Sequence, residues 1–236
     1  MHPDYTVRES ARAKHVRFRV TLSDGLVVVV PKGFDRGQIP ELVEEEREWI
    51  ARALKEIETR RADLPPADHR PETIDLPAIG QSWRLEWNET AGEKVSIAVT
   101  GPLRLRVSGP ISDRAAWGAA LRRWLLERGR EHLIPWTEDL ARTIGVRVRR
   151  SSIRCQRARW GSYSTSGTIS LNAQLLFLPE RLVRYVLLHE LCHAVHPNHS
   201  SSFWDLVRTH ERDVDGLRKE LRAAWRLVPT WLQRTH

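Results

Sequence analysis

Four of the ten histidines lie in one short segment, between residues 189 and 199. Two of them, His189 and His193, are four residues apart, so on a helix their imidazoles share one face and can bind the same metal ion. Glu190 follows His189 directly, where its carboxylate can reach a metal-bound water without binding the metal. The His-Glu-x-x-His pattern therefore predicts a zinc hydrolase, in which one Zn²⁺ lowers the pKa of a water and a carboxylate acts as general base.

The third metal ligand is expected from the residues that follow this helix. Pro197 cannot continue a helix, so the chain must bend there, and His199 could return beneath the first two histidines. His196 is the alternative if the helix persists, and otherwise we expect it beside a ligand or the substrate. A carboxylate further along, Asp205 or Glu211, is a less favoured alternative.

The spacing of His189, His193 and His199 equals that of the metzincin proteases, but two observations exclude that family. The metzincin motif has glycine at the position of His196, and its Met-turn requires a methionine downstream of the histidines. The sole methionine of this chain is Met1. The chain thus shares the metzincin ligand spacing without belonging to that family.

The elements that must position these residues follow from hydrophobic periodicity. Residues 15–22 and 26–30 flank Asp24-Gly25 and predict a β-hairpin. Residues 39–61 repeat apolar side chains at helical spacing and predict an amphipathic helix with an acidic outer face. The proline-rich residues 63–77 are expected to be irregular.

Residues 83–145 are predicted to form three further strands and then two helical stretches. Further strands are expected at residues 83–87, 94–99 and 103–107. A helix is predicted to begin after Ser112 and to be interrupted before Pro135, and a second helical stretch should end at Gly145.

From residue 146 to residue 227 the sequence predicts strands first and helices after them. Strand-like residues 146–154 and 168–171 flank the sequence Arg159-Trp160-Gly161-Ser162 and a polar turn at 164–167. Pro179 then opens a strongly apolar helix that cannot extend far past Pro197, and two closing helices are predicted at residues 201–212 and 214–227.

The composition excludes a wholly disordered chain, with 41% hydrophobic and 29% charged residues. Cys155 and Cys192 are too few for a disulfide framework or a cysteine zinc cluster. The first residues have no apolar segment of signal-peptide length, and the longest aliphatic run, residues 26–30, is far too short to span a membrane. We therefore expect a cytoplasmic protein without a membrane partner.

The net charge of +8 is concentrated in the middle of the chain, where residues 101–160 carry 14 basic and 5 acidic side chains. Residues 147–159 contain six arginines and no acid. These arginines form either a solvated strand face or a positive rim that attracts acidic peptides or nucleic acid. The segment has no interleaved aromatic residues and no recognised nucleic-acid motif.

Several short motifs together resemble one family. They are Arg159-Trp160-Gly161-Ser162, Leu171-Asn172, Tyr185-Val186-Leu187-Leu188 leading into His189, and His199-Ser200 followed by Phe203-Trp204, with upstream matches at Ala11-Arg12-Ala13-Lys14, Asp24-Gly25, Val30-Pro31 and Trp49-Ile50. With these motifs the chain resembles the YgjP-like metallopeptidases, a bacterial family of predicted zinc proteases distantly similar to the SprT and Wss1-like groups. The similarity spans nearly the whole chain.

This resemblance implies that His189, His193 and His199 bind zinc, that Glu190 is the catalytic base, and that the substrate is a polypeptide. The family usually has cysteine where this chain has Tyr163, so any catalytic or redox role of that cysteine is absent here. The Arg-Trp-Gly-Ser element is expected to form a strand edge beside the metal helix, where a substrate backbone could pair with it.

Hydrolysis of a peptide bond also requires a group that stabilises the oxyanion. By proximity in the sequence, the candidates for this role or for substrate contact are Arg159, Tyr163, Tyr185 and His196. The sequence favours none of the four, because a tyrosine on an apolar helix more commonly packs in the core.

The predicted fold class is α+β, with an N-terminal β-rich part, residues 1–110, packed on a C-terminal zincin-like core, residues 111–236, that contains the His-Glu-x-x-His helix. The predicted function is that of a zinc metallopeptidase. The alternative is a non-catalytic zinc-containing module that binds nucleic acid through residues 147–159.

Overall fold

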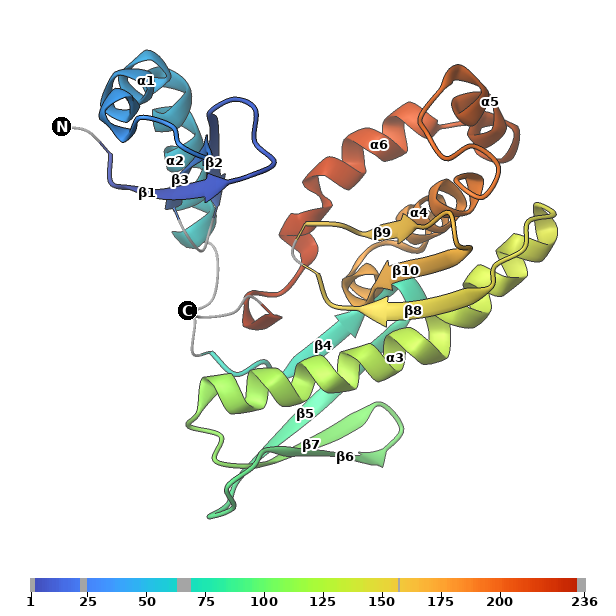
Figure 1. Ribbon diagram of the computed structural model, residues 1–236. Coiled ribbons are helices and arrows are strands. Elements are labelled where there is room, and N and C mark those ends of the chain that lie inside the picture. The colour runs from blue at the N-terminus through green and yellow to red at the C-terminus, as the bar shows by residue number, and fades with distance from the viewer. Residues whose placement is uncertain (1–2, 22–24, 63–68, 157, 233–236) are drawn as a thin grey trace. The chain divides into compact units, whose positions relative to one another are not determined.

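The computed structural model describes residues 3–21, 25–62, 69–156 and 158–232 (Figure 1). Its described residues form three sheets and six α-helices, as the predicted α+β class requires. The chain divides between residues 69 and 70 into two compact units, whereas the sequence placed the division at residue 110. Each unit has a hydrophobic core of its own.

The first unit is a three-stranded sheet with two helices. Its strands are β1 (Tyr5–Ser10), β2 (Arg17–Thr21) and β3 (Gly25–Pro31), in the order β1-β3-β2, and its helices are α1 (Ile39–Glu45) and α2 (Arg47–Ala62). The antiparallel pairing of β2 with β3 confirms the predicted hairpin strands; Asp24 of the predicted turn lies outside the described residues. The single helix predicted over residues 39–61 is divided at Glu46. Apolar side chains of β3, α1 and α2 form the core of this unit.

The second unit begins with a four-stranded sheet. Its strands are β4 (Thr73–Leu76), β5 (Gln81–Glu89), β6 (Ser96–Gly101) and β7 (Arg104–Gly109), in the order β4-β5-β7-β6. The last three of these strands confirm the predictions, but β4 lies within the segment that we expected to be irregular. Ile74 and Leu76 alternate with exposed residues and are buried, so burial of one face decides the strand where the prolines masked its signal.

Helix α3 (Arg114–Thr143) packs on this sheet through tryptophan pairs. Trp124 contacts Trp83, and Trp117 contacts Trp87, both edge to face with ring centroids 5.3 Å apart. These contacts join residues 70–110 to the following helix, which explains why the units divide near residue 70 and not at 110.

The predicted interruption of this helix at Pro135 is wrong, because α3 is continuous for 30 residues. Pro135 lies on the exposed side, while Leu133, Thr137 and Leu140 are buried on either side of it. The Thr137 hydroxyl also donates a hydrogen bond of 2.6 Å to the Leu133 carbonyl. Packing of both halves against one core therefore offsets the hydrogen bond that proline removes.

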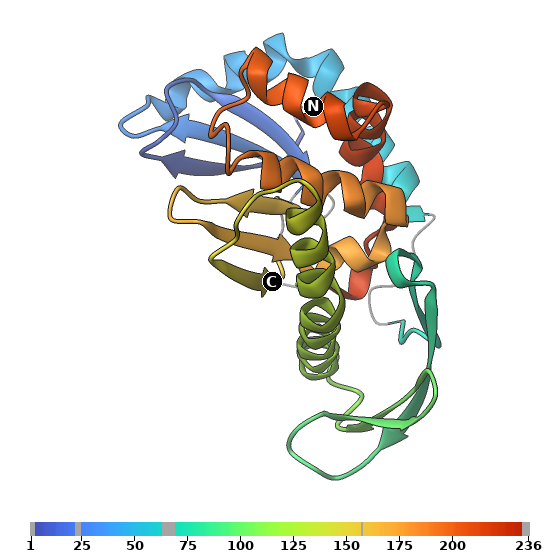
Figure 2. The ribbon, with the colours of Figure 1, turned by 90° about the vertical axis from the view of Figure 1, so that its right-hand side faces the viewer.

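A second, three-stranded sheet lies beside α3 (Figure 2). Its strands are β8 (Arg150–Arg154), β9 (Gly161–Tyr163) and β10 (Thr168–Asn172), in the order β8-β10-β9. Strands β9 and β10 confirm the strand edge expected at Arg159-Trp160-Gly161-Ser162 and the strand predicted at residues 168–171, whereas only Arg150–Arg154 of the predicted strand 146–154 form one. A Cβ at Gly129 of α3 would lie 2.8 Å from Ile153 Cγ2, so this glycine allows α3 to approach β8 closely.

Three helices complete the second unit: α4 (Glu180–Cys192), α5 (Ser201–His210) and α6 (Val214–Ala223). Nine of the 13 residues of α4 are buried, as its apolar sequence predicts, and Pro179 is its N-cap. Helix α6 packs on α4 and continues as a 3-10 turn, Ala224–Leu227. No helix within the described residues is both long and apolar enough to cross a bilayer.

Candidate active site

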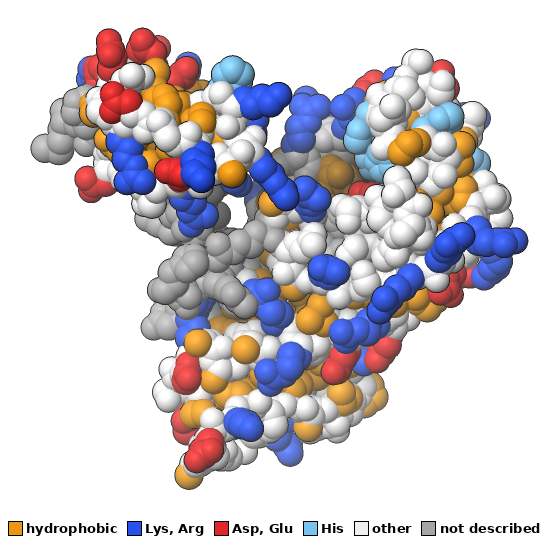
Figure 3. Space-filling model, in the orientation of Figure 1, with side chains coloured by type: hydrophobic (Ala, Val, Ile, Leu, Met, Phe, Trp, Pro, Cys, Tyr) orange, Lys and Arg blue, Asp and Glu red, His pale blue; other side chains and the backbone are white. Residues whose placement is uncertain are grey.

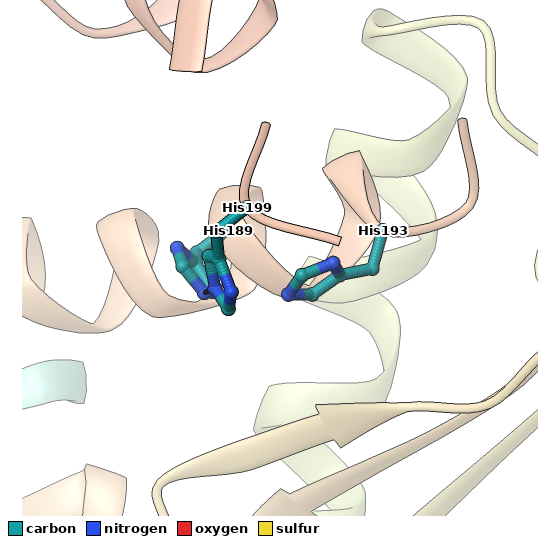
Figure 4. A group of neighbouring side chains, drawn as sticks. All are labelled: His189, His193 and His199. Carbon is teal, nitrogen blue, oxygen red and sulfur yellow. Dashed lines mark hydrogen bonds between the residues drawn. The ribbon is translucent and has the colours of Figure 1, made fainter. Parts of the chain in front are cut away.

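Three imidazoles converge at the C-terminal end of α4 (Figure 4). One ring nitrogen from each of His189, His193 and His199 lies within 4.8 Å of the other two. The Nε2 atoms of His189 and His199 are 3.0 Å apart, close to the separation of about 3.3 Å between two nitrogens that bind one tetrahedral zinc. This donor set of three nitrogens suits a metal such as zinc and not magnesium or calcium.

The end of α4 determines how His199 reaches the other two histidines. The helix ends at Cys192, and the C-cap His193 keeps helical φ and ψ of −66° and −14°, so its side chain stays on the face of His189. After the turn, the Ser200 hydroxyl accepts a 3.4 Å hydrogen bond from the Phe203 N–H and caps α5. Phe203, fully buried, stacks on the His193 ring at 4.6 Å.

Neighbouring groups set the orientation and the protonation of two of the imidazoles. His193 Nδ1 lies 3.1 Å from the backbone carbonyl of His196, which fixes the ring and leaves Nε2 free to bind a metal. Burial and the nearby His193, His199 and Arg218 lower the pKa of His189 to about 3. His189 is therefore neutral at physiological pH, which binding of a metal ion would require.

The alternative ligands lie elsewhere. His196 contributes its carbonyl to His193, and its ring is not part of the cluster. Glu211 lies 3.9 Å from Arg184, and Asp205 lies 3.7 Å from Arg208. Among the described residues, only the three predicted histidines form a group that could hold a metal.

Glu190 is held between α4 and β9. It is 8% exposed, and its carboxylate accepts a hydrogen bond from the backbone N–H of Tyr163. Burial raises the pKa of Glu190 to about 7, although the Tyr163 N–H and the charge of Arg159 act in the opposite direction. A group with a pKa near 7 can both accept and donate a proton at neutral pH.

Gly161 makes room for this carboxylate. A Cβ at this position would lie 2.7 Å from Glu190 Cγ and 3.0 Å from Oε1. Real Cβ atoms do not approach other atoms this closely, so the glycine of the Arg-Trp-Gly-Ser element is needed for contact between β9 and Glu190. The motif thus has a steric function that the sequence alone did not reveal.

Strand β9 is at the edge of its sheet within the described residues. The Trp160 carbonyl accepts from Asn172, and the Ser164 N–H donates to Thr168, so these residues pair with β10. Backbone groups alternate in direction along a strand, so those of Gly161 and Tyr163 point away from β10. The Tyr163 N–H is the one that binds Glu190.

The Asn172 side chain fixes the loop that leads into β9. This residue is 1% exposed, and its Nδ2 donates hydrogen bonds of 2.8 Å to the carbonyls of Gln156 and Arg159. Its Oδ1 accepts from the Gln174 N–H at 3.1 Å. All these bonds are within the protein, so Asn172 positions Arg159 and Gly161 without contacting the histidines.

A cavity of about 650 Å³ opens beside His189, His199 and Glu190. Apart from Gly161, its other lining residues are aromatic, aliphatic or basic: Arg159, Trp160, Tyr185, Val186, Trp204, Arg218, Leu221, Arg222 and Trp225. Trp160 and Trp225 stack on each other with ring centroids 3.8 Å apart. A cavity of this size is large enough for several residues of a peptide.

Of the four residues considered for oxyanion stabilisation or substrate contact, two line the cavity and two do not. Arg159 and Tyr185 line the cavity. The Tyr185 hydroxyl is buried without a hydrogen-bond partner among the described residues, and burial raises its pKa to about 12. The Tyr163 hydroxyl lies 3.5 Å from the Arg147 carbonyl, and neither Tyr163 nor His196 lines the cavity.

Sequence reasoning missed the contribution of α6 to this cavity. Arg218, Leu221 and Arg222 recur at helical spacing and face the site, and Trp225 follows in the next turn. The sequence predicted only a closing helix over residues 214–227, and no local signal connects these residues with the histidines. Within the basic segment, Arg147, Arg149, Arg150 and Arg154 are exposed and do not line the cavity. Figure 3 shows a row of Lys and Arg side chains on the surface over β8.

Comparison with known proteins identifies similar solved structures and the family of the chain. Two similar solved structures are the metallopeptidase zymogens abylysin from Pyrococcus abyssi and jannalysin from Methanocaldococcus jannaschii. Abylysin is 28% identical over 37% of this chain and 89% of its own, and jannalysin is 20% identical over 37% and 90%; both have a TM-score of 0.34. No curated protein matches the sequence. The family model described as "YgjP-like, metallopeptidase domain" matches residues 14–224, and the chain therefore belongs to the YgjP-like metallopeptidase family.

Proposed function

We propose that this protein is a zinc-dependent peptidase in which His189, His193 and His199 hold the metal and Glu190 is the catalytic base. The observation that carries the proposal is the convergence of three imidazole nitrogens within 4.8 Å, beside a buried carboxylate. Zinc, when bound there, would supply a Lewis acid for the scissile carbonyl and a water of lowered pKa.

Glu190 moves the proton in this proposal. Its carboxylate takes the proton that the attacking water releases and delivers it to the nitrogen of the leaving amine. The Tyr163 N–H holds the carboxylate in orientation, and burial raises the pKa of Glu190 to about 7, which suits both transfers. Gly161 keeps β9 close enough for that hydrogen bond.

The substrate backbone is proposed to lie along the free edge of β9. The backbone groups of Gly161 and the Tyr163 carbonyl point away from β10 and can pair with an extended peptide. Such a peptide would pass the three histidines and enter the cavity beside them. In this arrangement the sheet β8–β10 with α3 and α4 forms a zincin-like core.

A comparison of Glu190→Gln with the wild type tests this proposal. The amide keeps the size of the side chain and removes the base, so we expect the variant to retain one equivalent of zinc, measured by elemental analysis. Its cleavage of an unfolded protein substrate should fall by about 100-fold or more. Glu138→Gln at an exposed position of α3 is the matched control and should cleave as the wild type does.

Two outcomes would contradict the proposal. One is a wild-type protein with a full equivalent of zinc that cleaves no peptide or unfolded protein. The other is a Glu190→Gln variant that remains as active as the wild type. Steeply salt-dependent binding of DNA together with the first outcome would favour the alternative, a non-catalytic zinc-containing module.

A further inference from the structure

Three arginines line the cavity beside the candidate metal site. Arg218 and Arg222 come from α6, and Arg159 comes from the loop before β9. The one acidic residue of the lining is Glu190, whose carboxylate is bound by the Tyr163 N–H. The cavity therefore has an excess of positive charge before any metal ion is added.

Arg218 and Arg222 are one helical turn apart, so their side chains share a face of α6. The guanidinium of Arg218 lies 4.3 Å from the ring centroid of Trp204, and this ring in turn stacks on His199 at 5.5 Å. Only the Trp204 ring therefore lies between Arg218 and the candidate metal ligand His199. A ligand group that Arg218 binds would lie in the cavity near the candidate metal site.

The guanidinium groups remain available for a ligand. Among the described residues, Arg222 and Arg159 form no ion pair, and both are exposed. Arg218 has one partner, Asp215, at 3.5 Å, and that carboxylate is 81% exposed. An exposed pair at this distance contributes little, so Asp215 does not neutralise Arg218 for an incoming anion.

The aromatic lining favours a peptide over a nucleic acid. Nucleic-acid sites use free aromatic faces on which bases stack. Here Trp160 and Trp225 stack on each other, and Trp204 is covered by Arg218 and His199. Arginine, by contrast, binds a carboxylate through two parallel hydrogen bonds.

We propose that Arg218 and Arg222, with Arg159 from the β9 side, bind a carboxylate of the substrate beside the scissile bond, so that this peptidase selects acidic polypeptides. This inference rests on the proposed function for its account of cleavage. It concerns the cavity of α6 and β9 and not the exposed arginines of β8. The carboxylate comes either from a Glu or Asp side chain or from the C-terminus of the substrate.

Binding of labelled peptides to zinc-loaded full-length Glu190→Gln, measured by fluorescence anisotropy, tests the inference without catalysis. The peptides have one sequence with Glu, Gln or Lys at the central positions, each with a free or an amidated C-terminus. We expect an acidic peptide to bind at least about tenfold more tightly than its Gln counterpart, since a charge-assisted hydrogen bond contributes about that factor. Preference for internal Glu in the amidated peptides assigns the carboxylate to a side chain, and preference for the free C-terminus alone assigns it to the chain end.

Charge reversal makes the test specific. Arg222→Glu should abolish the preference for Glu over Gln and increase the affinity for the Lys peptide by about tenfold. Arg218→Gln, which retains a long side chain over Trp204, should reduce the preference without reversing it. Arg226→Glu, an exposed arginine just beyond α6 that does not line the cavity, is the matched control and should retain the wild-type preference.

Equal affinity for the Glu, Gln and Lys peptides would overturn the inference. It would also be overturned if a single-stranded oligonucleotide displaced the labelled acidic peptide at a lower concentration than the unlabelled acidic peptide does, in the same salt. Failure of the proposed function gives a different result. In that case the wild-type protein cleaves none of the peptides, yet the preference for the carboxylate and its reversal in Arg222→Glu persist.

Discussion

The side chain of Glu190 lies directly against the Cα of Gly161, so that a Cβ at residue 161 would be 2.7 Å from Glu190 Cγ. This contact connects the helix of the histidines with the edge strand beside it. It also places the carboxylate within reach of the Tyr163 N–H. The distance between these two residues therefore determines where the candidate base is held.

Gly161→Ala is expected to displace Glu190 and to reduce kcat by about 10- to 100-fold, because a shift of about 1 Å in a catalytic group has effects of this size. Zinc content should remain at one equivalent, since the histidines do not touch residue 161. Steady-state kinetics and metal analysis check both points. Gly118→Ala on α3, where a Cβ would be 3.5 Å from its nearest neighbour, is the control, and equal activity of the two variants would refute the steric explanation.

His199→Ala is expected to reduce zinc affinity by more than about 100-fold, because loss of a group that only supports a ligand already costs up to that factor. His196→Ala should bind zinc nearly as the wild type does, since it loses the ring and keeps the carbonyl that contacts His193. Competition with a chromophoric chelator measures both affinities. The opposite order would show that His196 is the third ligand.

Removal of zinc is expected to lower Tm, because an ion that binds only the folded state stabilises it by mass action. At a free zinc concentration of 100 times Kd, this contribution is about 2.7 kcal/mol. Calorimetry with and without a chelator measures the shift, and added zinc should restore the original Tm. His199→Ala should show almost no shift, and a full shift in that variant would place the metal elsewhere.

Asn172→Asp is expected to destabilise the protein by about 2 to 5 kcal/mol. The substitution replaces a buried donor with a carboxylate oxygen that faces the carbonyls of Gln156 and Arg159. Urea unfolding followed by tryptophan fluorescence measures the loss. Asn88→Asp at an exposed position of β5, where the amide makes one long 3.4 Å bond, is the matched control and should change stability by less than about 0.5 kcal/mol.

Gly129→Val is expected to destabilise the second unit by about 2 kcal/mol or more, because its side chain would overlap Ile153. The first unit has a separate core and should keep its own transition. Hydrogen exchange distinguishes the two units in one sample. Uniform loss of protection over both units would contradict this expectation.

The sequence by itself predicted the helix that carries His189 and His193 and favoured His199 over His196 as their partner. Helical periodicity is a local property, and Pro197 required a bend within reach of the same helix end. The strands around Arg159-Trp160-Gly161-Ser162 were likewise predictable from alternation over a few residues. The resemblance added the family, which the match over residues 14–224 shows.

The tertiary structure alone decided the rest of the site. The contact of Gly161 with Glu190 crosses from a strand to a helix, and the arginines of α6 reach the cavity because α6 packs on α4. The continuous helix through Pro135 has the same origin, since its two halves are held by one core. Local periodicity encodes neither the distance between elements nor the burial that overrides a proline, and both depend on long-range packing.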